Sequence, residues 1–297
     1  MIKRQFPLGF QWPTQEPFLF CVHHHDYYPR GTPEMGPDPK FLKGRTIGQD
    51  FEEKNGFRMY HGAVVPGFPV HPHRGFETVT IVYEGMVAHR DSAGHAGVIG
   101  PGDVQWMTAA SGIVHEELHE KEWAKNGGTL HAIQLWVNLP RASKMSAPGY
   151  QTILNGDIPV IDLDGGVGQL RVIAGSCLGH KGPAHTVTPV ELYDLQVKAG
   201  KLVTLALPEG HNTSILVLQG SASVNGGQVA GEAELIVCTR NGSQITVVAH
   251  EDSRFLVMAG EPIEEPIARY GPFVMNTRAE LMQAAEDYQA GKMGHLS

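Results

Sequence analysis

The sequence has few cysteines and no long apolar segment. Cys21, Cys177 and Cys238 are far apart and odd in number, which argues against a disulfide framework and against a paired-cysteine metal site. No stretch approaches the roughly 18 apolar residues of a membrane-spanning helix, so no membrane partner is expected. The opening MIKRQFPLGFQWP reaches two prolines before any apolar run of signal-peptide length. These absences favour a cytoplasmic protein with buried, reduced thiols.

Positive charge is also scarce. The formal net charge is −8, and no run of lysine or arginine interrupts the acidic balance. Phosphate backbones are bound by stripes of basic side chains, so direct binding to nucleic acid is not expected.

Turn-forming residues are abundant. The 36 glycines and 20 prolines separate short apolar segments, a pattern typical of strands joined by tight turns. At 297 residues the chain is long enough for two domains, and a connector lies near residue 152. We therefore predict an all-β fold of two β-barrels, with an amino-terminal domain over residues 1–150 and a carboxyl-terminal domain over residues 151–297.

Two segments differ from the strand pattern. Residues 23–60 are rich in turn formers and charges, which predicts an ordered loop insertion that could form a lid or an oligomer contact. Near the carboxyl end, NTRAELMQAAEDYQAG carries a capping box from Thr277 to Glu280 followed by apolar residues at helical spacing. This pattern predicts one amphipathic helix over residues 277–290, packed outside a barrel.

Two strand-like segments carry histidines at a spacing of two. In HPHRGFETVT, His71 and His73 project from one face of an extended strand, and Pro72 between them favours a strand edge or a bulge. In GIVHEELHE, His115 and Glu117 share a face in the same way. Two strands that each present two ligands predict a four-ligand metal site.

Three imidazoles and one carboxylate suit a first-row divalent ion, and iron(II), nickel, copper, manganese and zinc all remain open. Four protein ligands leave two positions of an octahedral ion for substrate and dioxygen. Glu77 and His119 have the same inward parity, so either could replace a ligand or hold an imidazole by its other nitrogen.

For the remaining histidines we expect roles other than metal binding, because a single histidine is more often a surface or hydrogen-bonded residue than a metal ligand. In the tract at residues 23–25, adjacent strand residues face opposite ways and Asp26 is the only nearby carboxylate, which favours a solvated role or a role in supporting a ligand. His61 could line a pocket, and structural roles are expected for His89, His95 and His131.

Three stretches resemble the signature of the pirins, a branch of the cupin superfamily. These are GFPVHPHRGFETVTIVYEG, GHAGVIGPGDVQWMTAASGIVHEE and IQLWVNLP, and GPFVMNTRAELMQAAEDYQAG is similar to the pirin carboxyl-terminal helix. The resemblance implies a bicupin fold with one metal ion, bound in the amino-terminal barrel by His71, His73, His115 and Glu117. Within the family iron(II) is the favoured ion.

The second half of the chain has a related pattern without these ligands. Aligning Gly220 of LVLQGSASVNG with Gly85 of IVYEGMVAHRD places Ala206 and Pro208 where His71 and His73 stand in the first half. The alignment therefore predicts a carboxyl-terminal cupin domain without a metal site.

The resemblance implies two alternative functions. Pirins resemble flavonol 2,4-dioxygenases, which open the central ring of quercetin with dioxygen, and in that reaction Glu117 would be the general base. Phe76, Trp106 and Met107 are candidate apolar walls for such an aromatic substrate. The alternative is a metal- or redox-responsive regulatory protein that acts through a protein partner. A cupin isomerase or sugar-binding barrel has no supporting residue.

Overall fold

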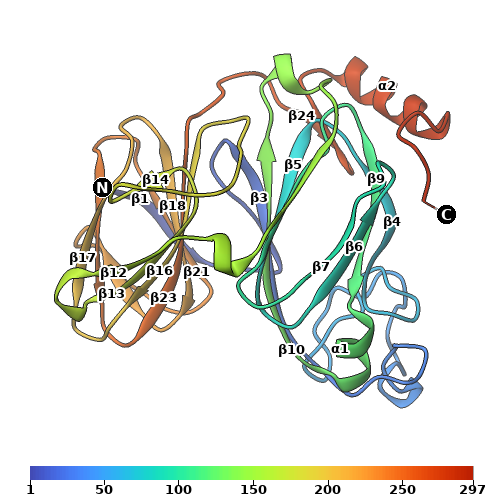
Figure 1. Cartoon of the computed structure of the whole chain (residues 1–297), viewed down its shortest axis with the longest axis horizontal. Coiled ribbons are helices and arrows are strands. Elements are labelled where there is room, and N and C mark those ends of the chain that lie inside the picture. Colours follow the sequence, from blue (N-terminus) through green and yellow to red (C-terminus); the bar gives the residue numbers. More distant parts are fainter. Residues whose placement is uncertain (297) are drawn as a thin grey trace. The chain divides into compact units, whose positions relative to one another are not determined.

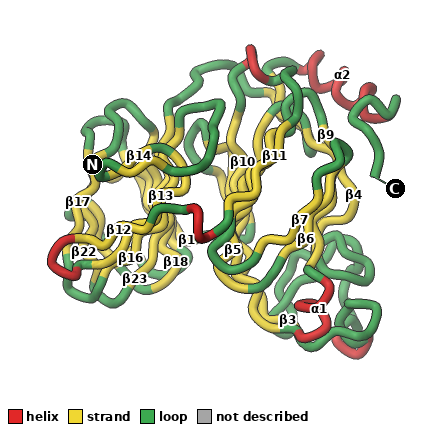
Figure 2. Tube along the Cα trace, in the orientation of Figure 1, coloured by secondary structure: helices red, strands yellow, loops and turns green. Residues whose placement is uncertain are grey.

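The computed structural model describes residues 1–296 (Figures 1 and 2). The described chain consists mainly of strands and forms two compact units. We call the unit made of residues 22–155 and the segment from residue 265 to the carboxyl end the amino-terminal barrel, and the unit made of residues 1–21 and 156–264 the carboxyl-terminal barrel. The predicted all-β class with two barrels is confirmed.

The amino-terminal barrel is built from two antiparallel sheets. Strands β11, β8, β5, β10 and β3 lie side by side in this order in one sheet, and β4, β9, β6 and β7 form the other. The bounds are β3 (Phe18–Tyr28), β4 (Gly67–His73), β5 (Phe76–Glu84), β6 (Val87–Asp91), β7 (Ala96–Ile99), β8 (Val104–Thr108), β9 (Ile113–His119), α1 (Lys121–Asn126), β10 (Gly128–Asn138) and β11 (Gly149–Ile153).

The segment predicted as a loop insertion is partly a strand. Residues 23–28 belong to β3, whose side chains alternate between the buried and the outer face, and the rest is irregular apart from one 3-10 turn, Pro39–Phe41. A buried ion pair orders this irregular part, because Arg45 Nη1 lies 2.6 Å from Asp50 Oδ2 and the two side chains are 0 % and 2 % exposed. Phe57 and Met59 then enter the apolar core between the sheets.

The carboxyl-terminal barrel repeats this strand arrangement. Its larger sheet has the order β1-β21-β18-β23-β16-β13-β12, and its smaller sheet has the order β17-β22-β19-β20, which matches β4-β9-β6-β7. The bounds are β1 (Ile2–Pro7), β2 (Gln11–Pro13), β12 (Val160–Leu163), β13 (Gly168–Ala174), β14 (Ser176–Cys177), β15 (His180–Lys181), β16 (Val190–Val197), β17 (Leu202–Ala206), β18 (Asn212–Gln219), β19 (Ala222–Val224), β20 (Val229–Ala230), β21 (Glu234–Cys238), β22 (Gln244–Ala249) and β23 (Ser253–Gly260).

Apolar side chains fill the interior of this second barrel. Val203 and Leu205 of β17 and Ile245 and Val247 of β22 belong to one buried cluster, on the strands that correspond to β4 and β9. The alignment that placed Ala206 opposite His71 is wrong by one residue, because Ala206 is exposed on the outer face of β17. A shift of one residue moves every side chain of a strand to the other face.

The two ends of the chain are exchanged between the units, unlike the single linear boundary near residue 150 that the sequence favours. Strand β1 pairs with β21 and extends the sheet of the carboxyl-terminal barrel. Helix α2 (Arg278–Gln289) follows the short hairpin of β24 (Ala268–Tyr270) and β25 (Phe273–Met275) and packs on the amino-terminal barrel through Ala284 and Val114. Thr277 and Glu280 form the predicted capping box, so the helix is confirmed.

The three cysteines are free and buried, as predicted. Burial raises the pKa of the Cys21 thiol well above its usual value, which disfavours the reactive thiolate. Among the described residues, no helix has both the length and the hydropathy needed to cross a membrane.

Candidate metal centre

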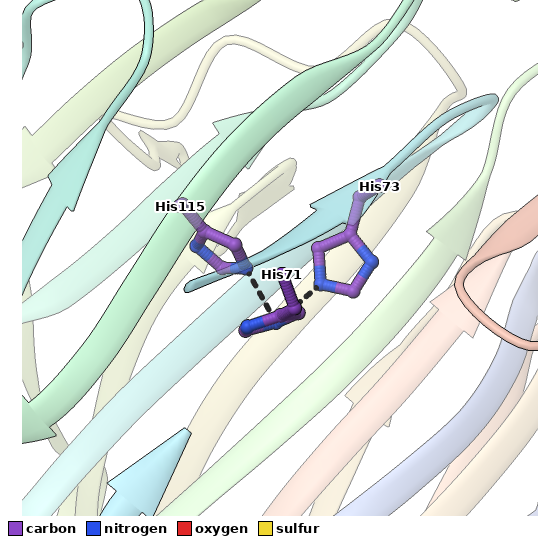
Figure 3. Close-up of side chains that lie close together, drawn as sticks. All are labelled: His71, His73 and His115. Carbon is purple, nitrogen blue, oxygen red and sulfur yellow. Dashed lines mark hydrogen bonds between the residues drawn. The ribbon is translucent and has the colours of Figure 1, made fainter. Parts of the chain in front are cut away.

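The three predicted histidine ligands lie together on two paired strands (Figure 3). His71 is directly opposite His115 in the register of β4 and β9, and His73 is on the same face of β4. Strand β4 lies at the end of its sheet and carries an irregularity between Phe68 and His71. Both features agree with the edge or bulge that Pro72 predicts.

The imidazole nitrogens have the spacing of metal ligands. His71 Nε2 lies 3.1 Å from His73 Nε2 and 2.9 Å from His115 Nε2. Two ligands bound at about 2.1 Å and about 90° to each other are separated by about 3.0 Å, so the three nitrogens suit one octahedral ion. The residues present therefore fit a divalent metal ion of the kind that imidazole prefers.

In His71 and in His115, the second ring nitrogen helps to set the orientation of the imidazole. His71 Nδ1 lies 2.7 Å from the carbonyl oxygen of Pro69, so it carries the proton and directs Nε2 to the centre. His115 Nδ1 lies 3.5 Å from His89 Nδ1, and His89 Nε2 in turn lies 3.4 Å from Asp91 Oδ2. A chain of polar side chains thus supports the His115 imidazole from β6.

Burial keeps the three rings neutral. It lowers the pKa of His71 and lowers the pKa values of His73 and His115 well below the usual value. Neutral imidazoles need lose no proton to bind a metal ion, so the centre is ready to bind at neutral pH.

Three neutral side chains hold the carboxylate of Glu117. Gln134 Nε2 donates to Oε2 at 2.8 Å, while Gln105 Nε2 and Thr80 Oγ1 donate to Oε1 at 3.3 and 3.2 Å. A ligand oxygen of Glu117 also lies within 4.8 Å of ligand nitrogens of His89 and His115. This group shares His115 with the three-histidine group, and the role of Glu117 as fourth ligand stays a prediction.

Sequence reasoning missed the side chains that support the centre. Thr80, Gln105 and Gln134 lie directly across from one another on β5, β8 and β10, and His89 lies on β6. Each of these side chains is on the inward face of its own strand, but only the pairing of the strands shows that they come together around Glu117.

Two residues considered as ligands lie elsewhere. Glu77 is on the face of β5 opposite to Thr80, and Thr108 Oγ1 donates to its carboxylate at 2.6 Å. Burial raises the pKa of Glu77 to about 7. The ring of His119 packs against Tyr28 and Trp123, at centroid distances of 4.3 and 4.9 Å.

Aromatic rings form one wall of the centre. The rings of Phe76 and Trp136 stack with their centroids 4.0 Å apart. Their centroids lie 5.0 and 5.1 Å from the centroid of the His73 ring. Trp106, which the sequence offered as a wall, follows Gln105 on β8 and therefore faces the opposite side of the sheet.

The residue after the His73 ligand ties the centre to helix α2. Arg74 Nη1 lies 2.8 Å from Asp287 Oδ2, and the two side chains are 5 % and 11 % exposed. Arg74 Nε also donates to the carbonyl oxygen of Ser111 at 2.7 Å, next to strand β9. This nearly buried ion pair fixes the end of β4 that carries His73.

The chain is similar to known proteins over both barrels. Residues 40–137 match the family model described as Pirin, and residues 192–294 match the model of the Pirin C-terminal cupin domain. A Pseudomonas aeruginosa protein whose name provisionally assigns it as a quercetin 2,3-dioxygenase is 52% identical over 76% of this chain and 79% of its own length. Mouse pirin is 37% identical over 80% of this chain and 81% of its own length.

A solved structure has the same fold over the whole chain. The crystal structure of a quercetin 2,3-dioxygenase from Acinetobacter baumannii covers 100% of this chain and 99% of its own, with a TM-score of 0.84 and 36% identity. The similarity therefore extends over both barrels.

Proposed function

Because this chain belongs to the pirin family of cupin proteins, we propose that it is a metal-dependent dioxygenase that opens the central ring of a flavonol such as quercetin. The observation that carries the proposal is the convergence of three neutral imidazoles beside a hydrogen-bonded carboxylate. The names of the Pseudomonas relative and the Acinetobacter structure support the same substrate class.

The residues that would hold the metal ion are His71, His73 and His115, with Glu117 as the fourth ligand. One divalent ion per chain is proposed, with iron(II) favoured and nickel, copper, manganese and zinc as alternatives. When bound, such an ion supplies Lewis acidity, which lowers the pKa of the flavonol 3-hydroxyl.

Glu117 is proposed to take the proton of that hydroxyl. Its carboxylate is positioned by Gln134 at 2.8 Å, and the two weaker hydrogen bonds to its other oxygen allow that oxygen to turn toward substrate. The partly exposed ring of Trp136, which stacks on the buried ring of Phe76, offers an apolar surface beside His73 on which the flat rings of a flavonol can lie. Loss of the proton makes the flavonol electron-rich, which prepares it for reaction with dioxygen.

The test is turnover of quercetin by untagged protein that has been stripped with chelator and reloaded with a single metal ion. We expect loss of the quercetin absorbance band with stoichiometric consumption of dioxygen. Glu117→Gln should keep the fold but lose about 10²–10⁴-fold in kcat, the usual contribution of a general base.

Glu116→Gln is the matched control. Glu116 is the neighbouring residue on β9, and its carboxylate pairs with Arg90 on the outer face. The control should retain wild-type turnover. Equal turnover in the Glu117→Gln variant would remove Glu117 from the mechanism, and the absence of turnover with every metal ion would favour the regulatory alternative.

A further inference from the structure

A second group of histidines lies on the amino-terminal barrel, apart from the metal centre. His23 and His25 are two residues apart on β3 and share its outer face, while His24 between them is buried on the other side. His131 is on β10, the strand beside β3 in the sheet. Because β10 lies beside β3, His131 joins the tract at residues 23–25, although it is more than a hundred residues away in the sequence.

The rings are already close together. His23 Nε2 lies 3.0 Å from His131 Nε2, the same separation as between the nitrogens of the metal centre. The ring of His25 stacks on His131 at a centroid distance of 4.6 Å and an interplanar angle of 23°. The centroids of His23 and His25 are 6.0 Å apart, so all three rings form one cluster.

The surroundings suit a cation from solvent. His25 is exposed and His23 is half-buried, so the cluster is open on the side of these two rings. Besides the neighbouring imidazoles of His25 and His24, the charged group that acts on His23 is Arg58, and Asp26 balances its charge, since Asp26 Oδ1 lies 2.7 Å from the guanidinium Nη1.

We propose that His23, His25 and His131 bind a second divalent transition-metal ion, weaker and more exchangeable than the ion of the cupin centre. Imidazole-only donor sets suit nickel(II), copper(II) and zinc(II), and the 3.0 Å separation of the first two nitrogens matches two neighbouring ligands on such an ion. His25 would complete the set by turning its exposed ring about the side-chain torsions.

The inference is independent of the proposed dioxygenase reaction, because the two groups share no residue. It also extends the sequence prediction of one metal ion per chain, which concerns the tightly held ion alone. The competing explanation for the short contact is a hydrogen bond in which one neutral imidazole donates its proton to the other.

Titration with nickel(II) separates these explanations. The protein is the untagged full chain carrying His71→Ala and His73→Ala, which disables the cupin centre, and heat is measured by calorimetry. We expect one equivalent of nickel(II) to bind. Adding His23→Ala or His131→Ala should weaken this binding by more than about tenfold, because loss of even an outer partner of a ligand costs 10–100-fold in metal affinity.

His250→Ala is the matched control, since His250 is an exposed histidine on the other barrel whose ring contacts Ser223 Oγ at 2.8 Å. It should leave nickel binding unchanged. If the variant with the disabled cupin centre folds poorly in a melting curve, the second equivalent is measured instead on wild-type protein whose cupin centre has been saturated.

Electron paramagnetic resonance with copper(II) gives a second readout. In the protein that carries His71→Ala and His73→Ala, the second cluster should show hyperfine coupling to several imidazole nitrogens, and adding His25→Ala should reduce that number. No binding beyond the cupin centre, or binding that survives the loss of both His23 and His131, would overturn the proposal and leave the pair as a hydrogen bond.

Discussion

Loss of the ion pair between Asp287 of helix α2 and Arg74, the residue after strand β4, should destabilise the amino-terminal barrel. Asp287→Asn leaves the Arg74 guanidinium, which is 5 % exposed, without its opposite charge. Breaking a buried pair costs about 3–5 kcal/mol, and Arg74 keeps its hydrogen bond to the carbonyl oxygen of Ser111, so we expect the low end, about 3 kcal/mol. For a domain of this size class that corresponds to a fall in Tm of roughly 6–12 °C.

Tryptophan fluorescence is a suitable probe of this transition. Trp106, Trp123 and Trp136 belong to the amino-terminal barrel, and only Trp12 belongs to the other unit. The unfolding transition that this signal follows should therefore move to lower temperature and lower denaturant concentration, while a transition of the carboxyl-terminal barrel followed by circular dichroism should not move.

Lys292→Ala is the control for the same carboxylate. Lys292 Nζ lies 2.8 Å from Asp287 Oδ1, but its side chain is 64% exposed. An exposed pair contributes at most about 1 kcal/mol, so this variant should stay close to wild type. If Asp287→Asn and Lys292→Ala had the same small effect, the argument that burial makes the Arg74 pair important would be refuted.

Two further predictions concern pH and metal. Lys292 and Arg74 hold the pKa of Asp287 well below its usual range. The ion pair of Asp287 with Arg74 therefore stabilises the folded protein fully above the unfolded pKa of about 3.9, and this stabilisation is lost progressively as the pH falls toward the lower pKa of the folded state. The difference in stability between wild type and Asp287→Asn should narrow in acid, which denaturant unfolding from pH 7 to pH 2.5 would show. His73→Ala should abolish metal binding at the cupin centre but lower stability only by the binding term, about 2.7 kcal/mol for an ion at 100 times its Kd. An unfolded variant, or unfolded chelator-treated wild type, would show instead that the metal ion is structural.

The ligand strands could be predicted from the sequence because they depend on local periodicity. His71 and His73, and likewise His115 and Glu117, are each separated by one residue on a single strand, so their shared face follows from the strand repeat alone. Glu77 shows where this reasoning fails. The turn between β4 and β5 contains Gly75 at φ 89°, and parity does not carry across such a turn.

Features that depend on pairing between distant strands could not be predicted. Gln134 supports Glu117 and His131 contacts His23 only because β10 lies between β5 and β3. The alignment of the two halves of the sequence fails for the same reason. It found the repeated strand arrangement, but it placed Ala206 one residue out of register.

The exchanged chain ends have a consequence for synthesis on the ribosome. Strand β1 is made before its partner β21, which emerges more than two hundred residues later, on the order of tens of seconds at usual elongation rates. The amino-terminal barrel is completed even later, because Arg74 can pair with Asp287 only after helix α2 has left the exit tunnel. Neither barrel can therefore be completed before its late partner segment has emerged, and until β21 is made β1 is an unpaired strand that a chaperone or a second nascent chain could capture.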